Sequence, residues 1–264
     1  MEINQAIYTY HNDNRYFDIF ADDGLLGKKA HIEGVISFSN VLTNFMLRTT
    51  DIDKELLMLC AEHHDDGRVN QFKLLGKFWD SEVTHNVLGL DRFDSYLQHL
   101  PEVAIDKSIS IFRDCILYHG RPALLASEES RPYVDIVTTA DDFENATSAV
   151  SYLLKEVETD AKGYRHNDPT ADQTICSSFV FEHFAKGEKF DKSVYCKTYA
   201  DYILFAATLA TNCIKRFDKV AKAIMLQPGH GYPSILEGYR NIFNQTLQAE
   251  TAERAYKVFS DMLA

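Results

Sequence analysis

The stretch "ELLMLCAEHHDDGR", residues 55 to 68, joins an apolar run directly to two histidines and two aspartates. The run from Leu56 to Ala61 is apolar on nearly every side, which predicts a helix that lies in the core. The chain then reaches His64 and Asp65 while still inside the protein, where a carboxylate needs a partner. Either the quartet is a charge cluster at a helix end, or it holds a metal.

The composition is that of an ordinary folded chain with an acidic balance. Of 264 residues, 45% are hydrophobic and only 12 are Gly and 6 Pro, which is enough for one substantial core. Lys and Arg number 27 against 39 Asp and Glu, giving a formal charge of −12. This charge argues against a surface that binds a phosphate backbone, so nucleic acid is not an expected partner.

The cysteines and the apolar segments point to the cytoplasm. The 5 cysteines are scattered and never paired as CxxC, as expected of reduced thiols. The first 20 residues lack the basic and apolar segments of a leader, and the apolar stretch from 202 to 210 is too short to cross a bilayer. We expect a cytoplasmic protein with no membrane partner.

Helical periodicity dominates the chain, and sustained period-two alternation is scarce, which predicts an all-α fold. We expect an irregular N-terminal arm over 1–27, a helical core over 28–164 and a C-terminal helical layer over 165–264, joined at the segment 165–172. The predicted helices are 28–48, 53–65, 81–98, 102–119, 131–160, 171–186, 192–226 and 235–262.

Three local signals predict where some of these helices begin and end. Thr170 with Gln173 and Ser234 with Glu237 have capping-box spacing, which indicates helix starts. Gly187 is typical of a helix stop, and residues 227–233 read as a loop.

Several polar residues continue apolar stripes into the core. On the helix predicted over 28–48 one stripe includes Val35, and His31 lies four residues earlier on the same face. The same spacing extends stripes on three later helices to His85, His119 and Asp141.

With His64 and Asp65, these make a set of inward-facing ionisable or coordinating residues that is costly to bury without compensation. One such histidine alone would be read as a satisfied core histidine, but the joint pattern favours a shared metal site. Imidazole and carboxylate ligands without a thiolate suit Mn, Fe, Co, Ni or Mg better than a structural zinc.

These residues resemble the HD phosphohydrolase superfamily, whose signature is a lone His, an adjacent His-Asp pair and a distant Asp. "KKAHIEGV" around His31 resembles the first element, "HHDDGR" the second and "IVTTADD" the last, and "THNVLG" and "LYHGR" resemble the extra histidines of the di-metal branch. The similarity covers roughly residues 28–150.

The resemblance implies an HD-domain helical core with additional C-terminal helices and two divalent transition metals, Mn or Fe first and then Co, Ni or Mg. It assigns His31, His64, Asp65 and Asp141 to the first metal. Asp65 bridges to a second metal, which is completed by His85 and His119.

The implied reaction is hydrolysis of a phosphate ester in a small phosphorylated substrate such as a nucleotide, by a metal-activated bridging hydroxide. The cations expected to bind the substrate's phosphates are Arg68, Arg121, Lys73 and Lys77. His63 and Asp66 either support the ligands and relay protons or form a partly exposed helix end.

Two rival functions keep the same fold. Some relatives with this ligand arrangement resemble mixed-valent di-iron oxygenases, and the ligands alone do not separate the two reactions. A non-catalytic nucleotide sensor comes third, although an intact ligand set argues against it. The sequence does not decide whether the chain forms a homodimer.

Overall fold

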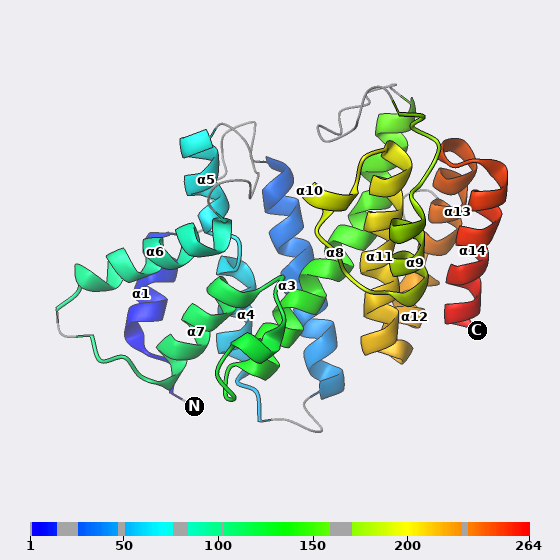
Figure 1. Ribbon diagram of the computed structural model, residues 1–264. Helices are drawn as coiled ribbons and strands as arrows, with labels where there is room; N and C mark the ends of the chain where they lie inside the picture. Colours follow the sequence, from blue (N-terminus) through cyan, green and yellow to red (C-terminus); the bar gives the residue numbers. More distant parts are fainter. Residues whose placement is uncertain are drawn as a thin grey trace. The chain divides into compact units, whose positions relative to one another are not determined.

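The computed structural model describes residues 2–14, 26–46, 51–75, 84–101, 103–158, 171–228 and 232–264. These residues form helices joined by turns, with no strand among them, so the predicted all-α class is confirmed (Figure 1). The elements are α1 (Gln5–Asp13), α3 (Leu26–Met46), α4 (Lys54–His63), α5 (Gly67–Leu75), α6 (His85–Gln98), α7 (Lys107–Tyr118), η1 (Ala123–Leu125), α8 (Arg131–Glu158), α9 (Ser178–Lys186), α10 (Lys192–Tyr195), α11 (Tyr199–Arg216), α12 (Asp218–Met225), α13 (Ile235–Thr246) and α14 (Ala249–Leu263).

The chain divides into two compact units, residues 1–141 and 142–264. The boundary falls inside α8, whose helix continues through it. The joint that the sequence predicts at 165–172 lies largely outside the described residues.

The N-terminal arm contains a helix, so the prediction of an irregular arm is wrong for residues 5–13. Asn4 caps α1 by accepting a hydrogen bond from the Ala6 amide at 2.9 Å. Tyr10 is fully buried, and its ring meets Phe93 of α6 edge-on with centroids 4.9 Å apart. Aromatic residues of the predicted arm therefore pack α1 against α6 within the first unit.

α5 begins as a separate helix just after the predicted end of the preceding one, and it lies against the start of α6. A Cβ atom on Gly67 would lie 1.8 Å from the His85 carbonyl oxygen and 2.5 Å from the Gly89 amide nitrogen. Only glycine permits this approach of two helix backbones.

In the second unit the helices are shorter than the periodicity predicts. The segment 192–226 divides into α10, α11 and α12, and 235–262 divides into α13 and α14. α9 begins after Ser177, not near Thr170, because the Ser177 hydroxyl caps it at the Val180 amide. Gly187 ends α9 in the left-handed conformation, as predicted, with φ 60°.

A buried carboxylate holds the starts of α9 and α11 together. Asp201 accepts hydrogen bonds from the backbone amides of Ser177, Lys197 and Thr198 at 2.8, 2.9 and 3.1 Å. With Thr198 it also forms a capping box at the start of α11.

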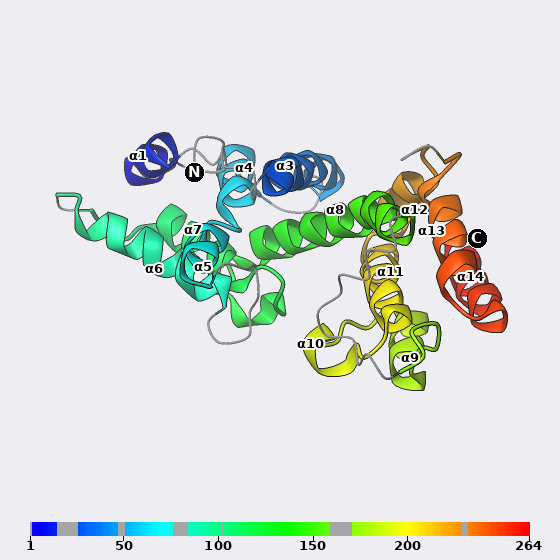
Figure 2. The ribbon, with the colours of Figure 1, turned by 90° about the horizontal axis from the view of Figure 1, so that it is seen from above.

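Buried aromatic side chains fill the second unit. α13 and α14 lie side by side in both views (Figures 1 and 2), and Phe243 stacks on Phe259 between them. Tyr239 is fully buried and its hydroxyl donates to the Ala146 carbonyl at 2.6 Å. Ser234 caps α13 by accepting from the Glu237 amide, consistent with the predicted helix start.

In the part of the chain that the structure describes, every helix is too short or too polar to cross a membrane. All five cysteines are free thiols.

Candidate metal centre

Side chains from five separate stretches of the first unit meet in one cluster. α3 and α8 contribute from their helical faces, α4 and α7 from the residues that follow them, and α6 from its first residue. We call this the six-residue cluster, and its members are His31, His64, Asp65, His85, His119 and Asp141. Five of them are buried, and the Asp141 side chain is 18% exposed.

Asp65 stands between two pairs of histidines. Its Oδ2 atom lies 3.7 Å from His31 Nε2 and 3.9 Å from His64 Nε2. Its Oδ1 atom lies 3.2 Å from His85 Nε2 and 3.5 Å from His119 Nε2. Each carboxylate oxygen thus faces its own pair of imidazole nitrogens, which is the arrangement that a carboxylate shared by two cations requires.

Asp141 completes the group on the Oδ2 side of Asp65. Its Oδ1 atom lies 3.3 Å from His31 Nε2 and 3.9 Å from His64 Nε2. Ligand atoms of His31, His64 and Asp141 all fall within 4.8 Å of one another, as do those of His64, Asp65 and His119. Either group could hold a metal ion.

The two ring nitrogens of His64 have different surroundings: Nδ1 faces the backbone and Nε2 faces the six-residue cluster. Its Nδ1 atom donates to the Ala61 carbonyl at 2.7 Å, because a carbonyl oxygen can only accept. Burial lowers the pKa of His64 to about 3, so the ring is neutral and Nε2 carries a lone pair. Among the described residues this buried Nε2 atom has no hydrogen-bond partner, and it faces the oxygens of Asp65 and Asp141. A lone pair aimed at two carboxylates is unfavourable unless a cation lies between them, so the residues fit a metal.

His119 is held in the same way on the other side. Its Nδ1 atom donates to the Ile116 carbonyl at 2.8 Å, and its Nε2 atom lies 2.9 Å from His85 Nε2. Asn86, next to His85 on α6, donates from Nδ2 to the His119 carbonyl at 3.0 Å. This amide fixes the start of α6 to the end of α7 and therefore keeps the two histidines together.

Two cations lie against Asp65. Lys28 Nζ is 2.7 Å from Oδ2, and Arg68 Nε is 3.5 Å from Oδ1. Burial opposes ionisation of Asp65, but Lys28, together with His64 and Arg68, brings its pKa well below the usual range. Burial likewise opposes ionisation of Asp141, whose pKa is nevertheless lowered by His31 and His64.

The sequence predicts Arg68 at the site, and the structure also places Lys28 and Asn86 beside the cluster, which the sequence analysis did not name. Lys28 precedes His31 by three residues, so both lie on one face of α3, and this spacing is the signal that could have found it. Nothing in the pattern around Asn86 marks it, since its partners come from α7.

The other cations predicted to bind phosphate are Arg121, Lys73 and Lys77. Arg121 NH2 donates to the hydroxyl of Thr84, the residue before His85, at 3.3 Å. Lys73 is exposed in the last turn of α5. Lys77 lies outside the described residues.

His63 and Asp66 point to α1 and not into the six-residue cluster. His63 Nδ1 is 2.9 Å from Asp66 Oδ2, and the Tyr10 hydroxyl donates to the same oxygen at 2.6 Å. Both side chains are buried, so the alternative of a partly exposed helix end does not hold. The quartet at 63–66 is divided: the outer pair contacts α1 and the inner pair belongs to the cluster.

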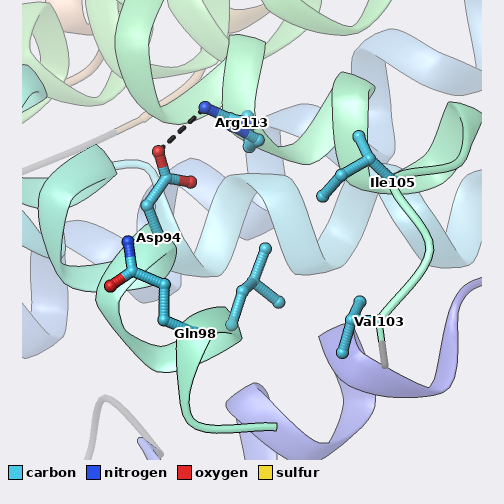
Figure 3. Close-up of a pocket in the computed structure, with 6 residues that line it drawn as sticks. Asp94, Gln98, Val103, Ile105 and Arg113 are labelled. Carbon is cyan, nitrogen blue, oxygen red and sulfur yellow. Dashed lines mark hydrogen bonds and ion pairs between the residues drawn. The ribbon is translucent and has the colours of Figure 1, made fainter. Parts of the chain in front are cut away.

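A separate pocket of about 300 Å³ lies where α6 ends and the segment before α7 begins (Figure 3). Asp94 and Arg113 form an ion pair at 2.8 Å on its wall, and the remaining lining is mostly apolar, from Leu97, Val103 and Ile105. We assign this pocket no function.

Comparison of the chain with protein-family models, with curated proteins and with solved structures gives no match. The geometry of the six-residue cluster is therefore the basis for inferring the function.

Proposed function

We propose that the chain is a metal-dependent phosphohydrolase of the HD type, acting on a small phosphorylated substrate. The observation that carries this proposal is the position of Asp65, with one carboxylate oxygen facing His31 and His64 and the other facing His85 and His119. A surface charge cluster would not be buried, and a satisfied core histidine would not leave Nε2 of His64 without a hydrogen bond.

In this proposal His31, His64 and Asp141 would hold one divalent cation together with Asp65. His85 and His119 would hold the second, also together with Asp65. When bound, two such cations lower the pKa of a water molecule and neutralise the oxygens of a phosphoryl group. Mn and Fe suit this set of nitrogen and oxygen ligands best, ahead of Co, Ni and Mg.

The chain's own cations bind the substrate's phosphate. Arg68 presents a planar guanidinium that can pair with two phosphate oxygens, and Lys28 adds a compact charge on the opposite oxygen of Asp65. Both side chains are partly exposed, at 17% and 23%, so an incoming anion can reach them. Arg121, hydrogen-bonded beside His85, is the third cation of the site.

A nucleotide or nucleoside phosphate is the substrate class we propose. A local concentration of cations in a protein of charge −12 favours a small anion over an extended polyanion.

The test is a panel of phosphomonoesters and phosphodiesters assayed with Mn²⁺, Fe²⁺, Co²⁺, Ni²⁺ and Mg²⁺, with and without oxygen. Elemental analysis of the purified protein accompanies the panel. Phosphate release without oxygen, lost in the His64→Ala, Asp65→Ala double variant, supports the proposal. Oxygen consumption with an iron-only requirement would replace it with the di-iron oxygenase, and nucleotide binding without turnover would replace it with a sensor.

A further inference from the structure

We propose a second, separate metal site in the first unit, formed by His11 of α1 and by Glu62 and His63 of α4, which takes Zn²⁺. Two histidines and one glutamate are a ligand set that zinc uses in sites with an open fourth position, unlike the closed sites of structural zinc. None of the six-residue cluster takes part in it, so it does not depend on the proposed function. The site joins α1 to α4.

The spacing of the three ligand atoms fits a small tetrahedral ion. His11 Nδ1 lies 3.1 Å from His63 Nε2 and 3.5 Å from Glu62 Oε1, and the three side chains offer ligand atoms that all lie within 4.8 Å of one another. With zinc–ligand distances of roughly 2.0–2.1 Å, the ligand atoms of a tetrahedron lie about 3.4 Å apart. The observed distances therefore need only small side-chain adjustments to accept the ion.

His63 is held in the orientation that a metal ligand requires. In the neutral ring, the Nδ1 atom donates to Asp66 Oδ2 at 2.9 Å, and the lone pair on Nε2 then faces His11. Asp66 is fixed in turn by the Tyr10 hydroxyl at 2.6 Å. A histidine that binds zinc through one ring nitrogen usually donates the N–H of its other ring nitrogen to a carboxylate or a carbonyl, which orients the ring.

Three possible ligand atoms lie close together at this point: a Glu62 carboxylate oxygen, His63 Nε2 and His11 Nδ1. Each offers a lone pair to a cation when both rings are neutral and carry their proton on the other nitrogen. A proton on His11 Nδ1 can hydrogen-bond to the Glu62 oxygen and to His63 Nε2, whereas a divalent cation can bind a lone pair from all three ligand atoms.

The site is buried on one side and open on the other. His63 is fully buried, whereas the His11 and Glu62 side chains are 24% and 13% exposed. An ion can therefore enter from solvent, and three protein ligands leave a fourth tetrahedral position for water. Since α1 and α4 are separated along the chain, Zn²⁺ bound here stabilises the docked position of α1.

The experiment measures zinc stoichiometry in the full chain. The wild type, His11→Ala, Glu62→Gln and the control His99→Ala are loaded with Zn²⁺, freed of excess ion and analysed for zinc and protein. His99 is an exposed histidine at the end of α6 and makes no contact with His11, Glu62 or His63. We expect His11→Ala to hold one zinc fewer than the wild type, and His99→Ala to hold the same number.

Glu62→Gln keeps the size of the side chain and is expected to weaken the same zinc equivalent at least tenfold. If His11→Ala does not fold, the zinc content of Glu62→Gln alone tests the proposed site. Titration with Co²⁺ adds a spectroscopic readout, since the absorption of tetrahedral Co²⁺ should be weaker in both variants than in the wild type. Equal zinc content and equal Co²⁺ spectra in the wild type and the variants would overturn the proposal and leave His11 and His63 as a hydrogen-bonded pair.

Discussion

Gly67 lies directly against the backbone of His85: a Cβ atom at position 67 would be 1.8 Å from the His85 carbonyl oxygen. The glycine that follows the quartet therefore sets how closely α5 approaches α6, and so where His85 stands relative to Asp65. We expect Gly67→Ala to force the two backbones apart and to destabilise the fold by about 1–3 kcal/mol, as overpacking typically does. Metal retention should fall with it, measured by elemental analysis beside thermal unfolding.

Gly238→Ala is the matched control, since its Cβ would lie 2.5 Å from Val150 Cγ1 in the second unit. It should lower the unfolding temperature without changing metal content. If Gly67→Ala kept wild-type metal content, the contact with His85 would have no part in placing the ligand.

His64→Ala removes the imidazole whose Nε2 faces both carboxylates. We expect phosphate-ester hydrolysis to fall more than about 100-fold, because loss of even a group that orients a metal ligand typically costs 10–100-fold. Initial rates at saturating Mn²⁺ check this, and an active His64→Ala protein would contradict the whole metal assignment.

Removal of metal should destabilise the wild type. An ion present at about 100 times its dissociation constant contributes about 2.7 kcal/mol of stability, so a chelator should lower the unfolding temperature by several degrees. The same chelator should shift the His64→Ala protein less. An identical shift in both proteins would place the stabilising ion elsewhere in the chain.

Lys28→Met and Arg68→Met test the phosphate-binding role of the two cations beside Asp65. A hydrogen bond to a charged group contributes about 1.5–3 kcal/mol, which corresponds to a fall of roughly 10- to 100-fold in kcat/KM for each variant. Lys257→Met removes a lysine that is 74% exposed in the second unit and should have no effect. Unchanged kcat/KM in both site variants would exclude them from substrate binding.

Asp201→Ala should destabilise the second unit by about 3 kcal/mol, since three backbone amides lose their acceptor and each such hydrogen bond contributes about 1 kcal/mol. Denaturant unfolding measures this loss. Asp218→Ala removes a carboxylate whose side chain is 61% exposed, and it should cost less than about 1 kcal/mol. Metal content should stay at the wild-type value in both variants.

The apolar stripes predicted the inward direction of four clustered residues because burial along a helix repeats with a fixed period, and the apolar run before His64 predicted that of His64 and Asp65. His31, four residues before Val35, does point into the core, and its Nε2 atom lies 3.3 Å from Asp141 Oδ1. Periodicity could not predict the role of Lys28, because a lysine on a helix normally occupies a solvated position. Its partner Asp65 comes from the turn after α4, which is distant in the sequence.

Helix ends were harder to predict for a similar reason. Phe217 divides α11 from α12 at φ −135°, without a glycine or proline to mark the break. The helix in the arm depends on Tyr10, whose burial comes from aromatic residues about 80 to 100 positions further along the chain. Contacts between segments that are distant in the sequence determine both features, and hydrophobic periodicity carries no information about such contacts.

The ion pairs of Asp65 bear on how the protein is assembled in the cell. Lys28 and Arg68 supply counter-charges to this carboxylate from the chain itself, so its burial does not need an external cation. A small zinc finger must wait for its ion before it folds. In the proposed function, the chain can therefore fold first and bind the proposed metals afterwards.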